Sequence, residues 1–261
     1  MTIMKHELRQ GRTAFLIWTG AIAFMLAICI LIFPEMKAEM ASVSKIFSAM
    51  GAFTAAFGMD RLDFGSLTGY YSIECGNVLG ICGALYAAVY AVDILSKEER
   101  GKTAEFLLTH PVSRARVITE KLLAVFCLIT VMNAVIYVVA LVSMILIGEA
   151  IPWKEINFTH LAYYLMQLEL AGICFGISAF IKRGSTGAGM GLAAILYFMN
   201  LFANISKSVR FIKYITLFGY CEGADITPAG KLNMTMVVIG MAIGALGIAA
   251  GYWKYLRKDI Q

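Results

Sequence analysis

Charged residues are scarce in this sequence, and their scarcity excludes an ordinary water-soluble domain. Asp, Glu, Lys and Arg make up 15% of the 261 residues, against roughly 25% in an average soluble domain. Only four prolines are present, which excludes proline-rich linkers and collagen-like repeats. Hydrophobic residues make up 60% of the chain and its mean hydropathy is +0.76. The composition therefore predicts a protein that folds within a lipid bilayer.

Metal-binding motifs are also missing. The six cysteines include no C-x-x-C pair, and all except Cys221 fall in apolar runs, where we expect them to pack as small apolar residues. The three histidines, His6, His110 and His160, are scattered along the chain. These spacings do not fit a zinc or haem site. We therefore expect no resident metal and no catalytic residue in this chain.

Long apolar runs are what the sequence has instead. One bilayer crossing takes about 20 apolar residues, and a scan for such runs predicts six spans over about 14–33, 70–92, 117–147, 160–181, 186–205 and 234–252. The third run is too long for one perpendicular crossing, so it should tilt or leave the hydrocarbon near Lys121. The weaker stretch 46–59 suggests an interfacial or half-inserted helix. The expected fold is an all-α polytopic membrane protein, with residues 1–261 in a single transmembrane domain.

Lysine and arginine are distributed unequally between the two sides of this predicted membrane. Fourteen lie in the two terminal tails and in the loops after the second and fourth spans, and eight lie on the other side. Because cytoplasmic loops are enriched in Lys and Arg, both termini are expected in the cytoplasm, with a bacterial plasma membrane as the location. This bias explains most of the net charge of +5, so no nucleic-acid partner is expected. Residues 1–12 separate apolar from basic residues, which predicts an N-terminal helix on the inner leaflet.

One cytoplasmic loop, between the second and third spans, combines charge, helix caps and periodicity. Ser96 and Glu99 have the spacing of a capping box. Glu98 and Lys102 have the spacing of a helical ion pair. A His-Pro pair then ends the pattern, because the residue before proline is disfavoured in a helix. We predict a short helix over about 96–110, whose apolar far end needs cover from the membrane or from a partner.

The residues of this loop resemble a stretch of the ABC-2 type transporter permeases. That family has the pattern E-x-x-G-T-x-E-x-L-L-x-x-P-V-S-R, and residues 98–114 here read EERGKTAEFLLTHPVSR, with a lysine inserted between the glycine and the threonine. The six-span layout, the N-terminal helix and the segment 65–70 resemble that family as well. The resemblance implies that the helix over about 96–110 is a coupling helix seated in a cleft of a separate ATPase subunit. The implied contact residues are Glu98, Glu99, Arg100, Gly101, Lys102, Thr103, Glu105, Phe106, Leu107, Leu108, Pro111 and Arg114.

A nucleotide site within the chain itself is not expected. Residues 101–103 match only the end of a phosphate-binding loop, Ser96 stands where that loop needs glycine, and a membrane helix precedes it in place of a strand. The resemblance implies that ATP and Mg are bound by a cytoplasmic ABC ATPase subunit in two copies. It also implies a second permease, which makes a homodimer or a pair of related chains. The expected function is the permease subunit of an ATP-driven exporter for an amphipathic or hydrophobic compound, such as a peptide, a lipid-like compound or an antibiotic.

Polar residues inside the spans are candidates for a substrate path or a dimer interface. A carboxylate within a span is costly and faces the bundle interior or water, which singles out Glu169, with Gln167 beside it. Asn133 and Asn200 are further candidates, although such asparagines more often join helices. An alternative function is an ion-coupled secondary carrier that uses Glu169 and Asp93. Against it stands the absence of paired ionisable residues at the midplane and of obvious internal repeats.

Glycines recur four residues apart in several spans, and this spacing predicts close helix packing. The loop 206–232 mixes aromatic and basic residues, which predicts amphipathic helical structure at the outer interface. The spaced glycines are Gly76 and Gly80, Gly172 and Gly176, Gly187 and Gly191, Gly240 and Gly244, and Gly247 and Gly251.

Overall fold

The computed structural model describes residues 1–40, 50–101, 112–181 and 186–257. Within these ranges the chain forms helices and turns, with no strand. Six helical segments of the described chain are long and apolar enough to cross a membrane. The expected all-α, six-span architecture is therefore confirmed. The six segments are Thr2–Ala38, Leu67–Asp93, Arg114–Leu146, Trp153–Phe180, Thr186–Ile205 and Met234–Arg257.

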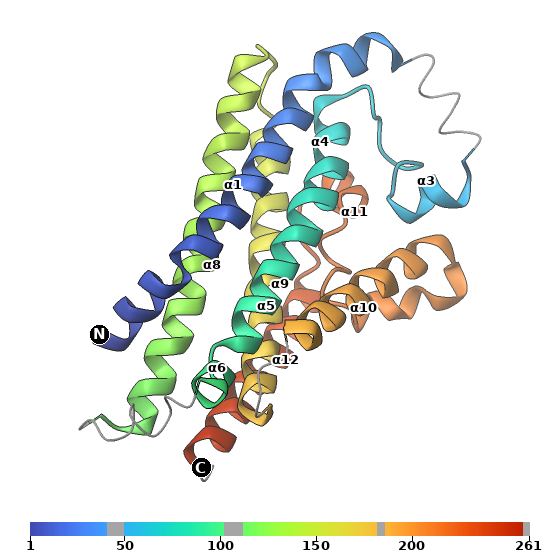
Figure 1. Ribbon diagram of the computed structural model, residues 1–261. Helices are drawn as coiled ribbons and strands as arrows, with labels where there is room; N and C mark the ends of the chain where they lie inside the picture. Colours follow the sequence, from blue (N-terminus) through green and yellow to red (C-terminus); the bar gives the residue numbers. More distant parts are fainter. Residues whose placement is uncertain (41–49, 102–111, 182–185, 258–261) are drawn as a thin grey trace.

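The long helices form a bundle in which α9 (Trp153–Phe180) is central. It packs closely against α12 (Met234–Arg257) and against the second span, while α1 (Thr2–Ala38) packs along α8 (Arg114–Leu146). Both chain ends lie at the same end of the bundle as α6 (Ser96–Arg100), as Figure 1 shows. We call this end the terminus side and the opposite end the far side.

The first helix differs from the sequence-based expectation at both ends. A separate N-terminal helix over residues 1–12 was expected, but α1 is one continuous helix of 37 residues that begins at Thr2. No turn residue other than Gly11 interrupts this region, so the helix has no reason to break there. At the other end α1 continues through Pro34 to Ala38, and its last turns bend away from α8 (Figure 1). A proline within a helix removes one backbone hydrogen bond and kinks the axis, which explains the bend.

The second span consists of three segments: α4 (Leu67–Cys75), the π-helix η1 (Gly76–Cys82) and α5 (Gly83–Asp93). Ser66 caps its start, because the Ser66 hydroxyl accepts a hydrogen bond of 3.1 Å from the Gly69 amide. The π-helical segment faces α9, where Tyr163 fills the space over Gly80. Such segments are rare in helices and often occur near functional sites.

The contact between α9 and α12 brings backbone against backbone. A Cβ atom on Gly172 would lie 2.7 Å from the carbonyl oxygen of Gly244, and one on Gly247 would lie 2.7 Å from the carbonyl oxygen of Gly172. A side chain at either position would collide with the opposite backbone. The glycines spaced four apart in the sequence are therefore explained by this close packing. We call this contact the glycine seam.

The connection between α10 (Thr186–Ile205) and α12 turns back into the protein. It contains the 3-10 helix η2 (Lys207–Tyr214), which partly fulfils the expected helical structure, and the short α11 (Gly223–Ala229). Between them, the six residues Thr216–Cys221 are all buried. Cys221 was expected in an outer loop, but it is only 1% exposed. All six cysteines are free thiols, and Cys75, Cys174 and Cys221 are buried.

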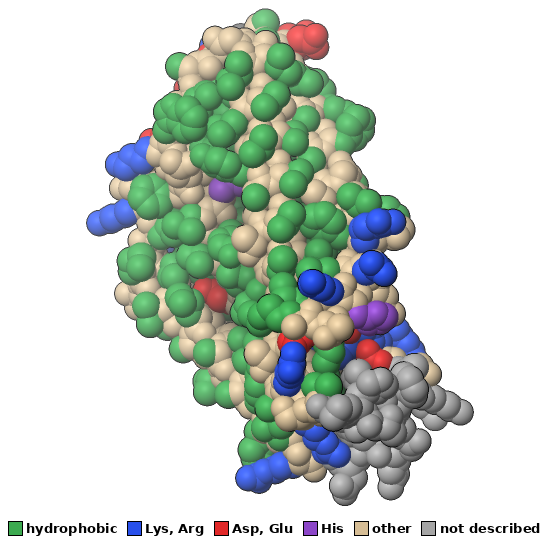
Figure 2. All heavy atoms as spheres, turned by 90° about the vertical axis from the view of Figure 1, so that its left-hand side faces the viewer, with side chains coloured by type: hydrophobic (Ala, Val, Ile, Leu, Met, Phe, Trp, Pro, Cys, Tyr) green, Lys and Arg blue, Asp and Glu red, His purple; other side chains and the backbone are tan. Residues whose placement is uncertain are grey.

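The outward face of α1 and α8 is apolar. Figure 2 shows hydrophobic side chains over most of its length, with many Lys and Arg residues gathered near the terminus side. Large exposed side chains such as Ile17 and Phe24 on α1 and Val138 and Ile145 on α8 make up this surface. Such a surface fits contact with lipid chains, and the cations fit the headgroup level.

Candidate functional site

A buried ion cluster joins α1, α6 and α8 on the terminus side. At its centre the ammonium group of Lys121, on α8, donates hydrogen bonds to Oε1 of Glu7 at 2.5 Å, to Oε1 of Glu98 at 2.8 Å and to the carbonyl oxygen of Ile94 at 3.1 Å. These three bonds satisfy all three donors of the ammonium group. Lys121 is 0% exposed and Glu7 1% exposed. Lys121 is therefore neutralised inside the protein, at the end of α8 where the sequence predicts that the span tilts or leaves the hydrocarbon.

Two further cations surround this cluster. Lys97, on α6, forms an ion pair with Oε2 of Glu7 and donates a hydrogen bond of 2.6 Å to Gln10. Arg100, also on α6, forms a two-pronged ion pair with Asp93 at 2.8 and 2.9 Å. The carboxylate of Glu7 on α1 thus binds one lysine from α6 and one from α8, which fixes the start of α6 against both helices.

A serine of α9 holds the start of α6 from the other side. The hydroxyl oxygen of Ser178 accepts hydrogen bonds from the amides of Leu95 at 3.0 Å and of Ser96 at 3.2 Å. Ser178 is 1% exposed. The hydroxyl of Ser96 donates to the carbonyl of Val92 at 3.1 Å, so its proton points back into the second span. Through these bonds α6 is connected to α9 as well as to α1 and α8.

The N-terminus of α1 is fixed to α8 by Glu120. Oε2 of Glu120 accepts hydrogen bonds from the amides of Ile3 at 2.9 Å and Met4 at 3.1 Å, and its Oε1 binds Arg116 at 2.9 Å. The first amides of a helix have no partner within the helix, and a carboxylate there also interacts favourably with the helix dipole. The start of α1 is therefore part of the same rigid unit.

The sequence-predicted contact residues fall partly inside the described chain. The α6 helix begins at Ser96, where the coupling helix was expected to begin, and Arg114 begins α8. Glu98 points inward to Lys121, while its expected partner Lys102 lies outside the described residues. The contact residues outside the described ranges are, in all, Lys102, Thr103, Glu105, Phe106, Leu107, Leu108 and Pro111.

Sequence reasoning missed three members of this arrangement: Glu7, Glu120 and Ser178. Glu7 lies on a helix face that looks amphipathic and exposed in the sequence, yet its partner is 114 residues away. The one available signal was a lysine, Lys121, inside an otherwise apolar run, because a lysine in such a position needs a carboxylate partner.

Of the four polar residues singled out within the spans, the structure brings two together. Asn133 on α8 donates a hydrogen bond of 2.7 Å to Gln167 on α9, and Gln167 donates to the carbonyl of Leu79 at 3.4 Å. The amide of Gln167 lies against Gly83, where a larger side chain would collide with it. These contacts join α8, α9 and the second span in the middle of the bundle.

Glu169 lies apart from this pair, although it is two residues from Gln167. Its Oε2 accepts a hydrogen bond of 2.9 Å from the Tyr220 hydroxyl, and its side chain packs against Gly240 of α12. Glu169 is 4% exposed, and its other oxygen has no hydrogen-bond partner among the described residues. The acid therefore holds the buried connection 216–221 against the glycine seam.

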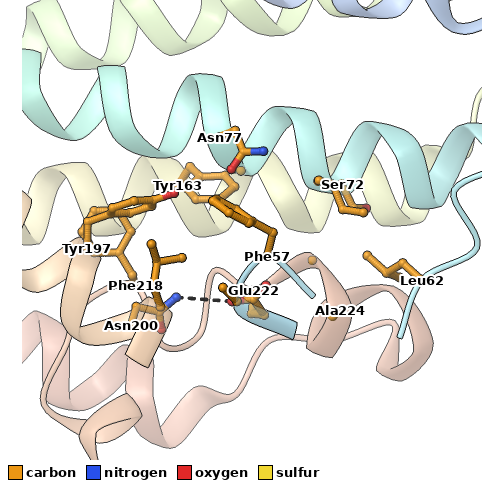
Figure 3. A pocket seen from close by; sticks show the side chains of 15 residues that line it. Phe57, Leu62, Ser72, Asn77, Tyr163, Tyr197, Asn200, Phe218, Glu222 and Ala224 are labelled. Atoms are coloured by element: carbon orange, nitrogen blue, oxygen red, sulfur yellow. Dashed lines mark hydrogen bonds between the residues drawn. The ribbon is translucent and has the colours of Figure 1, made fainter. Parts of the chain in front are cut away.

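Asn200 lines a small hollow of about 30 Å³ toward the far side, shown in Figure 3. Its amide nitrogen donates to Oε2 of Glu222 at 3.3 Å, and the same oxygen accepts a bond of 2.7 Å from Asn204. Tyr163 of α9, Tyr197 of α10 and residues of the second span form the other walls. The hollow holds about two water-sized spheres.

Ion pairs fix α11 beside this hollow. Asp225 binds Arg61 at 2.6 Å and Lys213 at 2.9 Å. Partial burial disfavours ionisation of Asp225, but the hydrogen bonds and charges of Lys213 and Arg61 outweigh it and hold the Asp225 pKa below its ordinary value of 3.8. The carboxylate is thus charged at neutral pH and joins η2 to α11.

Comparison with known protein families identifies the family of this chain. The family model described as ABC-2 family transporter protein matches residues 1–260, which is nearly the whole chain. The chain belongs to the ABC-2 transporter family. No curated protein matches the chain closely enough to count as a relative. Membership makes this protein a membrane permease subunit of the ABC type, and the family implies association with an ABC ATPase partner.

Proposed function

We propose that this ABC-2 permease is the membrane subunit of an ATP-driven exporter, and that the segment beginning at α6 is its contact with the ATPase. The observation that supports this most directly is the buried cluster around Lys121. It joins the first turn of that segment to α1 and α8, while Ser178 joins it to α9. A force applied to α6 would therefore reach three long helices at once.

In the proposed complex two ATPase subunits bind ATP and Mg, and two copies of the permease form a homodimer. The terminus side faces the cytoplasm of a bacterial cell, as the distribution of Lys and Arg indicates. The contact surface consists of Glu98 to Gly101 together with the predicted contact residues between 102 and 114. No step of ATP chemistry is assigned to the permease.

The proposed substrate is an amphipathic or hydrophobic compound. The four polar residues singled out in the spans are all buried, and among these four only Asn200 lines one of the described hollows. We place the path beside the second span, with Asn200 near the far side and the Asn133 and Gln167 pair deeper in the bundle. Glu169 stays a candidate for the path or for the interface between permeases.

Among the described residues, no contact favours the alternative of an ion-coupled carrier. Asp93 is bound to Arg100 on the terminus side, whereas Glu169 is bound to Tyr220 in the bundle. The two acids are held by different partners and do not form one ion site.

The test is reconstitution with an ABC ATPase subunit, which is to be sought among the genes beside the one for this chain. The purified pair in proteoliposomes should show ATPase activity that rises when the permease is present. Glu99→Lys and Phe106→Asp should lower this stimulation at least fivefold, and both leave the residues of the buried cluster in place. Glu35→Lys, an exposed carboxylate on the far side, is the matched control and should keep full stimulation. Unchanged stimulation in both variants, or no co-purification, would contradict the proposal.

A further inference from the structure

The carboxylate of Glu222 lies in the wall of the hollow beside Asn200. Asn200 and Asn204 both turn their amide nitrogens to Oε2 of Glu222. Their amide oxygens are buried and have no hydrogen-bond partner among the described residues. Exchanging nitrogen and oxygen in either amide would set an oxygen against the carboxylate, so the orientation is fixed by electrostatics. Both asparagines therefore present only amide nitrogen to Glu222, which lines the hollow.

The charge of Glu222 is also left without a cation. No ion pair to Glu222 is found in the described part of the chain. Arg61, the basic residue at this position of the fold, is engaged by Asp225 and Asp60, and Lys213 is engaged by Asp225. A partly buried carboxylate with only neutral donors gains free energy from a cation beside it.

The walls around the Glu222 carboxylate are aromatic. Figure 3 shows Tyr163, Tyr197, Phe57 and Phe218 surrounding the space between Asn77 and Glu222. Aromatic faces attract organic cations, and the attraction is stronger when the cation is removed from water. Within the described residues no group of three His, Cys, Asp or Glu side chains could hold a metal ion. The chemistry therefore fits an ammonium group better than a metal.

An apolar hollow of about 150 Å³ adjoins this site. The two hollows share Tyr197 and Phe218, and the second is lined otherwise by apolar residues of the second span and α10, including Leu85, Ala194 and Phe198. A ligand whose ammonium group lies in the first hollow would therefore pass Tyr197 and Phe218 to place an alkyl chain in the second. This adjacency favours an amphipathic ligand over a free inorganic cation.

We propose that this pair of hollows binds an amphipathic primary amine, with its ammonium group at Glu222 and its apolar chain between α5 and α10. The ammonium group supplies the cation that the Glu222 carboxylate lacks among the described residues. This assignment rests on the proposed function, because it names a class of substrate for the exporter.

Binding is tested on the full-length chain in phosphatidylcholine nanodiscs. The probe is octylammonium chloride, compared with 1-octanol, ammonium chloride and sodium chloride. Octylammonium should bind in isothermal titration and raise the Tm, whereas the other three should have little effect. Glu222→Gln should weaken octylammonium binding at least tenfold, and Glu35→Gln, which changes an exposed carboxylate on the far side, should change it less than twofold.

A second variant keeps the test valid if Glu222→Gln does not fold. Ala194→Trp fills the apolar hollow without changing the acceptors, and it should remove the advantage of octylammonium over ethylammonium. Octanol binding as strong as octylammonium, sodium chloride acting equally well, or wild-type binding in both variants would overturn the proposal. These outcomes leave ATPase stimulation by the permease untouched, so failure of amine binding is distinguishable from failure of the proposed function.

Discussion

The ammonium group of Lys121 on α8 lies 2.5 Å from Oε1 of Glu7 on α1, and neither side chain is more than 1% exposed. Removing one partner of an ion pair that is buried in this way strongly destabilises the fold, because the other charge then stays buried alone. The pair also binds the base of α6 through Glu98 and Lys97. Loss of this ion pair is therefore expected to affect both the stability of the protein and the coupling of α6 to α1 and α8.

Lys121→Met should destabilise the protein by about 3–5 kcal/mol, because Glu7 and Glu98 lose their buried cation. Thermal unfolding in one detergent measures the effect, and the double variant Glu7→Leu with Lys121→Met should recover part of it. The control is Lys37→Met, which removes an exposed pair with Glu149 and should cost less than about 1 kcal/mol. Equal losses in Lys121→Met and Lys37→Met would show that the cluster is not a buried ion site.

Gly172→Ala should push α9 and α12 apart, because its Cβ atom would lie 2.7 Å from the carbonyl oxygen of Gly244. We expect a loss of about 1–3 kcal/mol in unfolding free energy, as in other overpacked sites. Gly191→Ala on α10 is the matched control, since nothing lies within 4 Å of a Cβ there, and alanine favours a helix by about 1 kcal/mol. Similar melting curves for the two variants would contradict the glycine seam.

Glu169→Gln should preserve both folding and ATP-driven transport, because glutamine can still accept the hydrogen bond from Tyr220. Tyr220→Phe should be more harmful, by about 1–3 kcal/mol, because it leaves a buried acceptor without a donor. Tm values and transport in proteoliposomes check both expectations. A Glu169→Gln variant that assembles normally but no longer transports would favour the ion-coupled carrier.

The ion pairs of Asp225 should stabilise the far side in a pH-dependent manner. The Asp225 pKa is lower in the folded protein than its ordinary value of 3.8, so the stabilisation is complete well above that value and is lost as the pH falls through the lowered pKa. Asp225→Asn should therefore speed hydrogen exchange of α11 at pH 7. The difference from the wild type should shrink below about pH 4. A difference that persists unchanged in strong acid would mean that the charge of Asp225 is not responsible.

The spans were predictable because each one depends on local composition. The expected range 186–205 coincides with α10, and the last span begins at Met234 as expected. Helix ends were harder: α1 continues five residues beyond the expected end at Phe33, because a proline bends a membrane helix without ending it. The π-helical segment has no sequence signal beyond its glycines.

The site was predictable only where it is contiguous in sequence. Residues 96–101 were recognised from their pattern and family resemblance, whereas Glu7 and Ser178 come from distant helices. Glu222 also escaped notice, since a carboxylate in a loop looks solvated until the fold places Asn200 and Asn204 beside it. Pairings between distant segments depend on tertiary packing, which periodicity does not encode.

The π-helical segment Gly76–Cys82 sets the two halves of the second span out of phase. A π-helical turn holds one residue more than an α-helical turn, so the face that α5 presents to α9 does not continue the face of α4. A relative that lacks one residue between Gly76 and Cys82 can therefore keep both halves in their places with an ordinary α-helix. The same deletion elsewhere in this span would rotate one half by about 100°. Length differences among relatives in this span are accordingly expected at that segment.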